Sequence, residues 1–125
     1  MQNYTDLNVW QKSMDLVEEV YTLVKRLPKE EMYALSSQLR RAAVSIPSNI
    51  AEGNGRSSRK EYLRFLLISR GSTFEVETQL LICVKVEYLV EEEIERAMTL
   101  CSEVKKMLNG LIRNLSNLTE NTKEK

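Results

Sequence analysis

The chain has 125 residues, of which 42% are hydrophobic and 29% are charged, with only four glycines and two prolines. Eighteen basic residues balance eighteen acidic ones, so no overall field draws the protein to nucleic acid or a membrane, and any electrostatic partner must recognise a local patch. The sequence contains no histidine, which removes the commonest general base and the usual ligand of zinc and di-iron sites. These properties argue against an enzyme, and we expect neither a cofactor nor a metal.

The first predicted helix runs from about Leu7 to Leu27 and has two apolar stripes. Alternating spacings of four and three residues place one stripe on a single face: Trp10, Met14, Val17, Tyr21 and Val24. A second stripe lies beside the first: Leu16, Val20, Leu23 and Leu27. Pro28 then begins a connection, because the residue before a proline resists helical dihedral angles.

The second predicted helix runs from about Met32 to Gly53. The same spacing forms its apolar face: Leu35, Leu39, Ala42, Ile46 and Asn49. Pro47 removes one backbone hydrogen bond from this helix, so we expect a local kink. Gly53 and Gly55 suit the left-handed conformations of a helix end and a tight turn.

The third predicted helix begins at Ser58, which forms a capping box with Glu61, and ends at about Glu87. Its core-facing residues are Tyr62, Leu66, Ser69, Thr73, Val76, Leu80 and Cys83. The fourth, from about Glu91 to Leu118, has the most regular pattern: Ile94, Ala97, Cys101, Val104, Leu108, Leu111, Leu115 and Leu118.

Four such helices with short connections predict an all-α protein, an antiparallel up-down-up-down four-helix bundle. We expect one domain over residues 1–118 and a disordered tail over residues 119–125, which contain no apolar residue. Cys83 and Cys101 fall on apolar faces and form no metal-ligand pattern, so we expect buried, reduced thiols. Neither a signal peptide nor a bilayer-spanning run is apparent, and we expect a cytoplasmic protein with no membrane partner.

The third helix also has an apolar row on the side that a monomeric bundle would leave polar. The row consists of Leu67, Ile68, Phe74, Leu81 and Ile82. A row of this length is typical of a partner interface, and the double stripe of the first helix, through Leu16 and Leu23, is the natural complement in a neighbouring copy. A head-to-tail contact of this kind closes into a ring if the rotation permits. Alternatively, the bundle is irregular and the third helix is central.

Charge is unevenly distributed along the chain. Between Ser36 and Ser72, seven basic residues face two acidic ones, which gives a net charge of +5 and leaves −5 for the rest. The candidate phosphate-binding residues are Arg40, Arg41, Arg56, Arg59, Lys60 and Arg64. We expect Arg70 to pair with a carboxylate such as Glu77 on its own helix. The alternative interpretation is a solvated surface, or salt bridges to an acidic region of a neighbouring subunit.

Three runs of the sequence closely resemble a known family: DLNVWQKSMDLVEEVY, SSQLRRAAVSIPSNIAEGNGRSSRKEYLRFL and ISRGSTFEVETQLL. The family is that of the bacterial four-helix-bundle proteins of the 23S ribosomal RNA intervening-sequence type, some of which are labelled ribosomal proteins. The resemblance spans about Asp6 to Leu115. The family is also similar to the accessory variability proteins of diversity-generating retroelements. That similarity implies a pentameric ring with basic surfaces that engage nucleic acid and a reverse transcriptase.

The sequence and the resemblance together predict a non-enzymatic, ring-forming bundle that binds RNA, or DNA, through phosphate contacts. The rival hypothesis is a protein-interaction scaffold whose arginines pair with acidic residues. An enzyme is the third hypothesis, with the carboxylates of Glu91–Glu95 as a metal-binding cluster. That acidic run is more simply a helix start favoured by the helix dipole.

Overall fold

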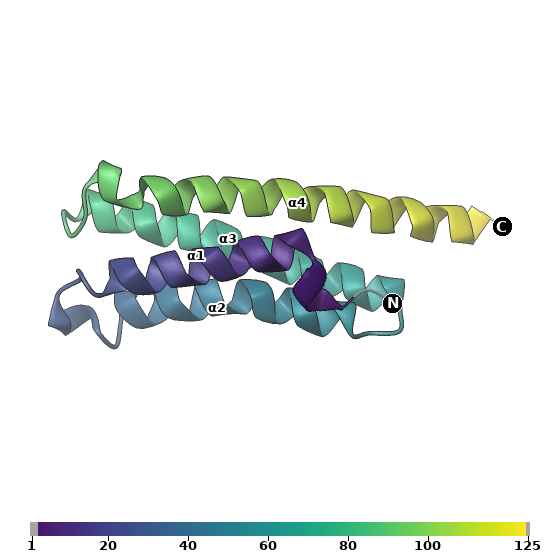
Figure 1. The fold of residues 1–125 in the computed structure, drawn as a ribbon, viewed down its shortest axis with the longest axis horizontal. Helices are drawn as coiled ribbons and strands as arrows, with labels where there is room; N and C mark the ends of the chain where they lie inside the picture. Colours follow the sequence, from purple (N-terminus) through teal and green to yellow (C-terminus); the bar gives the residue numbers. More distant parts are fainter. Residues whose placement is uncertain (1–2, 125) are drawn as a thin grey trace.

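The computed structural model describes residues 3–124, except for the side chains of residues 119–124. Four α-helices account for most of these residues: α1 (Asn8–Val24), α2 (Leu35–Asn54), α3 (Arg59–Lys85) and α4 (Glu91–Glu124). Two 3-10 turns, η1 (Tyr4–Asp6) and η2 (Lys29–Glu31), precede α1 and α2. The described residues contain no β-strand, and successive helices run in opposite directions (Figure 1). The prediction of an all-α bundle is therefore confirmed.

Each helix packs against two others. Both α1 and α3 contact α2 and α4 but not each other, so α1 and α3 lie diagonally across the bundle. The α1–α2 and α3–α4 connections lie together at one end, and the α2–α3 turn lies at the other end, beside the N-terminal segment (Figure 1). We call these the loop end and the turn end. None of the described helices combines the length and apolar character that crossing a bilayer requires.

The two stripes of α1 are placed the other way round from the prediction. Leu16 and Leu23 are only 0% and 2% exposed and belong to the core of their own bundle, whereas Met14 and Tyr21 are exposed. The prediction that Leu16 and Leu23 contact a neighbouring copy is therefore wrong. The physical reason is that aliphatic side chains fill a dry core, while Met and Tyr tolerate half-exposure at its border.

The predicted core faces of α3 and α4 are largely correct. On α3, Leu66, Val76 and Leu80 are fully buried, and so are the polar side chains of Ser69 and Thr73. On α4 the buried residues are Ile94, Ala97, Leu100, Cys101, Val104, Leu108 and Leu115, whereas Leu118 is exposed. The backbone of α4 is helical through Glu124, beyond the predicted end at Leu118. The expectation of a disordered tail over residues 119–125 stays a prediction, because the side chains of residues 119–124 and the whole of residue 125 lie outside the described part of the chain.

Small polar side chains line the contact between α2 and α3. The Ser69 hydroxyl donates to the Ile46 carbonyl at 2.9 Å, and the hydroxyl oxygens of Ser45 and Ser72 are 2.8 Å apart. The Asn49 amide donates to the Ser45 carbonyl at 2.8 Å and to its hydroxyl at 2.9 Å. These hydrogen bonds satisfy polar groups that burial would otherwise leave without partners, and the small side chains let the two helices approach closely.

The approach is tightest at Gly53, near the end of α2. A Cβ atom at this position would lie 2.8 Å from the Phe65 Cβ and 2.9 Å from the Tyr62 Cδ1. The expectation of left-handed glycines is wrong, because no described glycine has a positive φ and Gly55 has φ −80° and ψ −5°. Gly53 is therefore required for lack of space and not for backbone conformation.

Glu31 joins the two connections at the loop end. One of its carboxylate oxygens accepts from the Leu35 amide at 3.3 Å, and the other accepts from the Tyr88 hydroxyl at 2.9 Å. The hydrogen bond to Glu31 raises the pKa of Tyr88 above its ordinary value. Glu31 thus satisfies a free backbone amide in the first turn of α2 while holding the α3–α4 connection against it.

Replacing Gly53 with alanine is expected to lower the free energy of unfolding by about 1–3 kcal/mol, because the new methyl group overlaps two aromatic side chains. Gly110→Ala is the matched control, since a Cβ there would meet nothing within 4 Å. In a helix that change stabilises by roughly 0.5–1 kcal/mol. Urea unfolding of both variants at one protein concentration measures the difference, and equal stabilities would contradict the crowding.

The two cysteines are expected to be inert in the folded protein. Burial raises the pKa of Cys83 to about 11 and that of Cys101 to about 12. The protonated thiols therefore contribute stability below the ordinary thiol pKa, and this contribution is lost as the pH rises towards the folded values. Ellman's reagent at about pH 8 should label both thiols in denaturant and neither in the native protein. Rapid native labelling would show that the thiols are accessible.

Candidate nucleic-acid interface

The basic residues at the turn end are positioned by the start of α3. The Glu61 amide donates to the Ser58 hydroxyl at 3.3 Å, which confirms Ser58 as the N-cap of this helix. The cap places Arg59, Lys60 and Arg64 on the first two turns, where all three side chains are exposed. These residues form a compact basic surface with Arg56, which lies in the turn itself.

An aromatic ring organises this surface. The guanidinium carbons of Arg56 and Arg64 lie 5.1 Å and 5.0 Å from the centroid of the Phe65 ring. Arg56 also forms an ion pair with Glu52 at 2.9 Å, one helical turn before it. Cation–π contact and the ion pair hold the guanidinium groups at defined places on the surface. Phe65 was not among the predicted site residues, although the sequence places it next to Arg64 and nine residues after Arg56.

Arg40 and Arg41 do not join the surface at the turn end. They precede Arg56 by about sixteen residues, or about 24 Å along a helix. Arg40 donates to the Met32 carbonyl at 3.5 Å, near the loop end. Arg41 lines an open cavity of about 290 Å³ between α2 and α3. The six predicted phosphate-binding residues therefore form two groups and not one patch.

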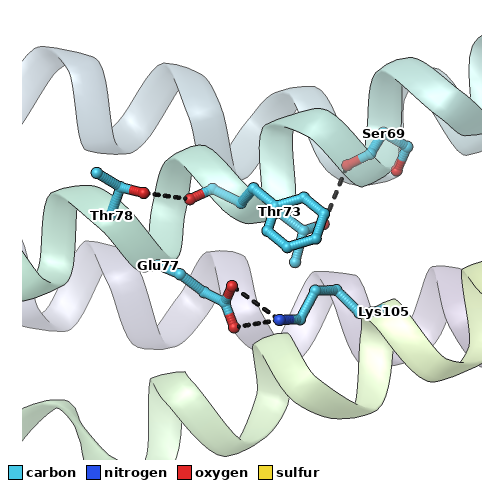
Figure 2. Close-up of polar contacts among 6 residues, drawn as sticks. Ser69, Thr73, Glu77, Thr78 and Lys105 are labelled. Carbon is cyan, nitrogen blue, oxygen red and sulfur yellow. Dashed lines mark hydrogen bonds and ion pairs between the residues drawn. The ribbon is translucent and has the colours of Figure 1, made fainter.

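The expected pairing of Arg70 with Glu77 is wrong. Arg70 donates to the Asn109 side-chain oxygen at 2.9 Å, and Glu77 forms an ion pair with Lys105 at 2.8 Å. Figure 2 shows the Glu77 carboxylate on α3 pointing towards the Lys105 ammonium on α4. Residues seven apart are two helical turns away, about 10 Å, so partners on the adjoining helix are closer. Lys105 also lies 4.7 Å from the centroid of the Phe74 ring.

Acidic side chains gather at the loop end. Glu93 accepts from the Val90 amide and pairs with Arg26, and both interactions lower the pKa of Glu93. Glu91, Glu92 and Glu95 line an open cavity of about 510 Å³ whose apolar wall includes Leu81, Ile94 and Met98. Among the side chains that the structure describes, no group of three or more His, Cys, Asp or Glu residues is placed to hold a metal ion.

The apolar row of α3 is exposed. Leu67, Ile68, Phe74, Leu81 and Ile82 are each 41–53% accessible to solvent. A second apolar surface is a groove of about 300 Å³ between α1 and α2. Its lining includes Tyr4, Trp10, Met14, Val17, Val44 and Pro47. Because α1 and α3 are diagonal in the bundle, the row and the groove face different directions.

The N-terminal segment contributes to the turn end, although none of its residues was among the predicted site residues. Tyr4 packs edge-on against Trp10, with ring centroids 5.4 Å apart. Asn3 accepts from the Thr5 amide at 3.0 Å and so caps the turn that contains Tyr4. No repeated pattern in the sequence linked Tyr4 to α2, because a single 3-10 turn has no periodicity to detect.

Fold and site together define a small four-helix-bundle protein with one basic end. The family model described as 23S rRNA-intervening sequence protein matches residues 5–110, and the chain belongs to this family. A crystal structure of a protein with unknown function, from the S23 ribosomal protein family of Bacteroides thetaiotaomicron, superposes with a TM-score of 0.77. It is 28% identical and covers 83% of this chain and 97% of its own. No curated protein sequence matches this chain.

Proposed function

We propose that this protein is a non-enzymatic, oligomeric bundle that binds RNA through the phosphate backbone at its turn end. The observation that carries the proposal is the stacked cluster of Arg56, Phe65 and Arg64 beside Arg59 and Lys60. Planar guanidinium groups suit phosphate, and neutralising phosphates releases counterions without any need to read sequence. Membership of a family described by a 23S rRNA intervening sequence favours RNA over DNA as the ligand.

The second basic group extends the proposed path of the ligand. Arg40 and Arg41 lie on the same helix that leads into the turn, so a strand running along α2 would reach both groups. The interval of about 24 Å is several times the spacing of neighbouring phosphates along a nucleic-acid strand. Arg41 and Arg56 are therefore contacts for different phosphates of one RNA molecule.

The proposed oligomer joins two different surfaces. The apolar row of α3 in one copy packs into the α1–α2 groove of the next, a head-to-tail contact that leaves the same pair of surfaces free on each successive copy. Rings close such contacts, and the resemblance to retroelement accessory proteins favours five subunits. A ring whose axis follows the bundles would bring the turn ends to one face and multiply weak phosphate contacts by avidity.

Removing three charges at the turn end is expected to weaken RNA binding at least tenfold at moderate salt. The variant is Arg56→Gln/Lys60→Gln/Arg64→Gln. The slope of log affinity against log salt concentration should also become shallower by about 2, because three phosphate contacts to a single strand are lost. A titration of labelled ribosomal and random RNA across salt concentrations measures both quantities.

The matched control is Lys25→Gln/Lys29→Gln/Lys85→Gln, which removes the same charge from exposed lysines at the loop end. Equal losses in the two triple variants would show a nonspecific charge effect. Absence of RNA binding by the wild-type protein at low salt would reject the proposal.

Replacing Leu67 and Leu81 with glutamine is expected to convert the oligomer to a monomer. Both side chains are already exposed in a single bundle, so the substitutions should leave its helical content and unfolding largely unchanged. Sedimentation measures the mass in solution, and Val90→Gln is the control, since Val90 is 54% exposed but lies outside the row. A wild-type protein that is monomeric at micromolar concentration would contradict the proposed assembly.

The alternative function is a protein-interaction scaffold that recruits a polypeptide such as a reverse transcriptase. The observation that favours it is the cavity at the loop end, where Glu91, Glu92 and Glu95 surround an apolar wall. Such a surface suits a basic, partly apolar segment. Recovery of a protein partner free of nucleic acid from the host would support the scaffold over RNA binding.

A further inference from the structure

The turn end contains an open cavity that the basic surface alone does not explain. The cavity has a volume of about 560 Å³ and lies between the N-terminal 3-10 turn and the last turns of α2. Its lining consists of Tyr4, Ser48, Ala51, Glu52, Gly55 and Arg56. It therefore combines an aromatic side chain, a hydroxyl, a carboxylate and a guanidinium around one space large enough for a nucleotide.

Tyr4 is held in place at this cavity while remaining accessible. Its ring packs edge-on against Trp10 at an interplanar angle of 67°, and its side chain is 39% exposed. The turn that contains it is fixed by the Asn3 cap and by the Gln11 side chain, which donates to the Thr5 carbonyl at 2.9 Å. A ring fixed in this way loses little conformational entropy when a planar ligand stacks on it.

Arg56 belongs to both the basic surface and the cavity. Its guanidinium lies over the Phe65 ring and pairs with Glu52, and Glu52 itself lines the cavity. A phosphate bound at Arg56 would therefore place its attached nucleoside at the mouth of the cavity. The hydroxyl of Ser48 and the carboxylate of Glu52 are the hydrogen-bonding groups available to the base inside.

We propose that this cavity binds one unpaired nucleotide of the RNA, with its base stacked on Tyr4 and its phosphate on Arg56. The inference rests on the proposed RNA binding and makes it more specific, since a base can enter the cavity only where it is unpaired. Single-stranded segments and loops are then favoured over a continuous duplex, in which every base is already stacked and paired.

Two variants test the cavity independently. Tyr4→Ala removes the stacking surface and is expected to weaken binding of an unstructured RNA of about twelve nucleotides by about tenfold or more. Gly55→Leu adds a side chain at the cavity wall, where a Cβ meets only ordinary contacts at 3.6 and 3.7 Å. We expect a similar loss from Gly55→Leu, because the added side chain occupies the space of the base.

The controls separate stacking from charge and from assembly. Tyr4→Phe keeps the aromatic face and should bind within about twofold of wild type, as should Tyr33→Ala, which removes a 92% exposed tyrosine at the loop end. Binding of a blunt RNA duplex should not change in Gly55→Leu, whose substitution lies outside the groove that Tyr4 lines. Gly55 does not line the α1–α2 groove, so the mass of Gly55→Leu in solution should equal that of wild type.

The inference requires that both cavity variants lose affinity for the single strand. If either binds it as wild type does, while the turn-end triple variant still loses affinity, the nucleotide site is wrong and phosphate binding stands. Equal wild-type affinity for duplex and single strand also overturns the inference. If the wild-type protein binds neither RNA, the proposed function fails together with it.

Discussion

The close contact between α2 and α3 is the constraint on which the turn end depends. Gly53 lets the backbone of α2 approach Tyr62 and Phe65 within a distance that any side chain would block. The serine hydroxyls farther along the same contact satisfy the polar groups that this approach buries. Because the guanidinium groups of Arg56 and Arg64 both contact the Phe65 ring, the packing of Phe65 against Gly53 also positions those two charges.

Charge and apolar surface are separated along and around the bundle. Arginines gather at the turn end, whereas the carboxylates of Glu91, Glu92 and Glu95 line a cavity at the loop end. The exposed row of α3 and the α1–α2 groove lie between these ends on different sides. A neutral chain can therefore offer a basic surface, an acidic surface and two apolar surfaces at once. Salt screens exposed charges that lie far apart, so a charged ligand responds to the nearby charges more than to the total charge of the protein.

The sequence predicted the helices well because their apolar periodicity is long and regular. It did not predict which stripe of α1 would be buried, since Met14 and Tyr21 have the same spacing as a core stripe and differ only in how well they tolerate water. The predicted pairing of Arg70 with Glu77 was also wrong. Both residues have their partners on α4, and the apolar pattern of α3 alone does not determine which side chains of α4 face it. The contribution of Tyr4 to the turn end depends on a tertiary contact of one short turn, which leaves no periodic signal.

The ion pair between Glu52 and Arg56 has a consequence for which anions the turn end can retain. The carboxylate already neutralises the guanidinium, so an isolated phosphate gains little by replacing it, since one anion is simply exchanged for another in contact with water. In the proposed RNA complex a polymer would differ, because its neighbouring phosphates would reach Lys60 and Arg64 in the same event and offset the cost of displacing Glu52. Because the ion pair is exposed to solvent, it contributes only about 0.3–0.5 kcal/mol, so under the proposed function Glu52 favours a polymer over an isolated phosphate without excluding the latter.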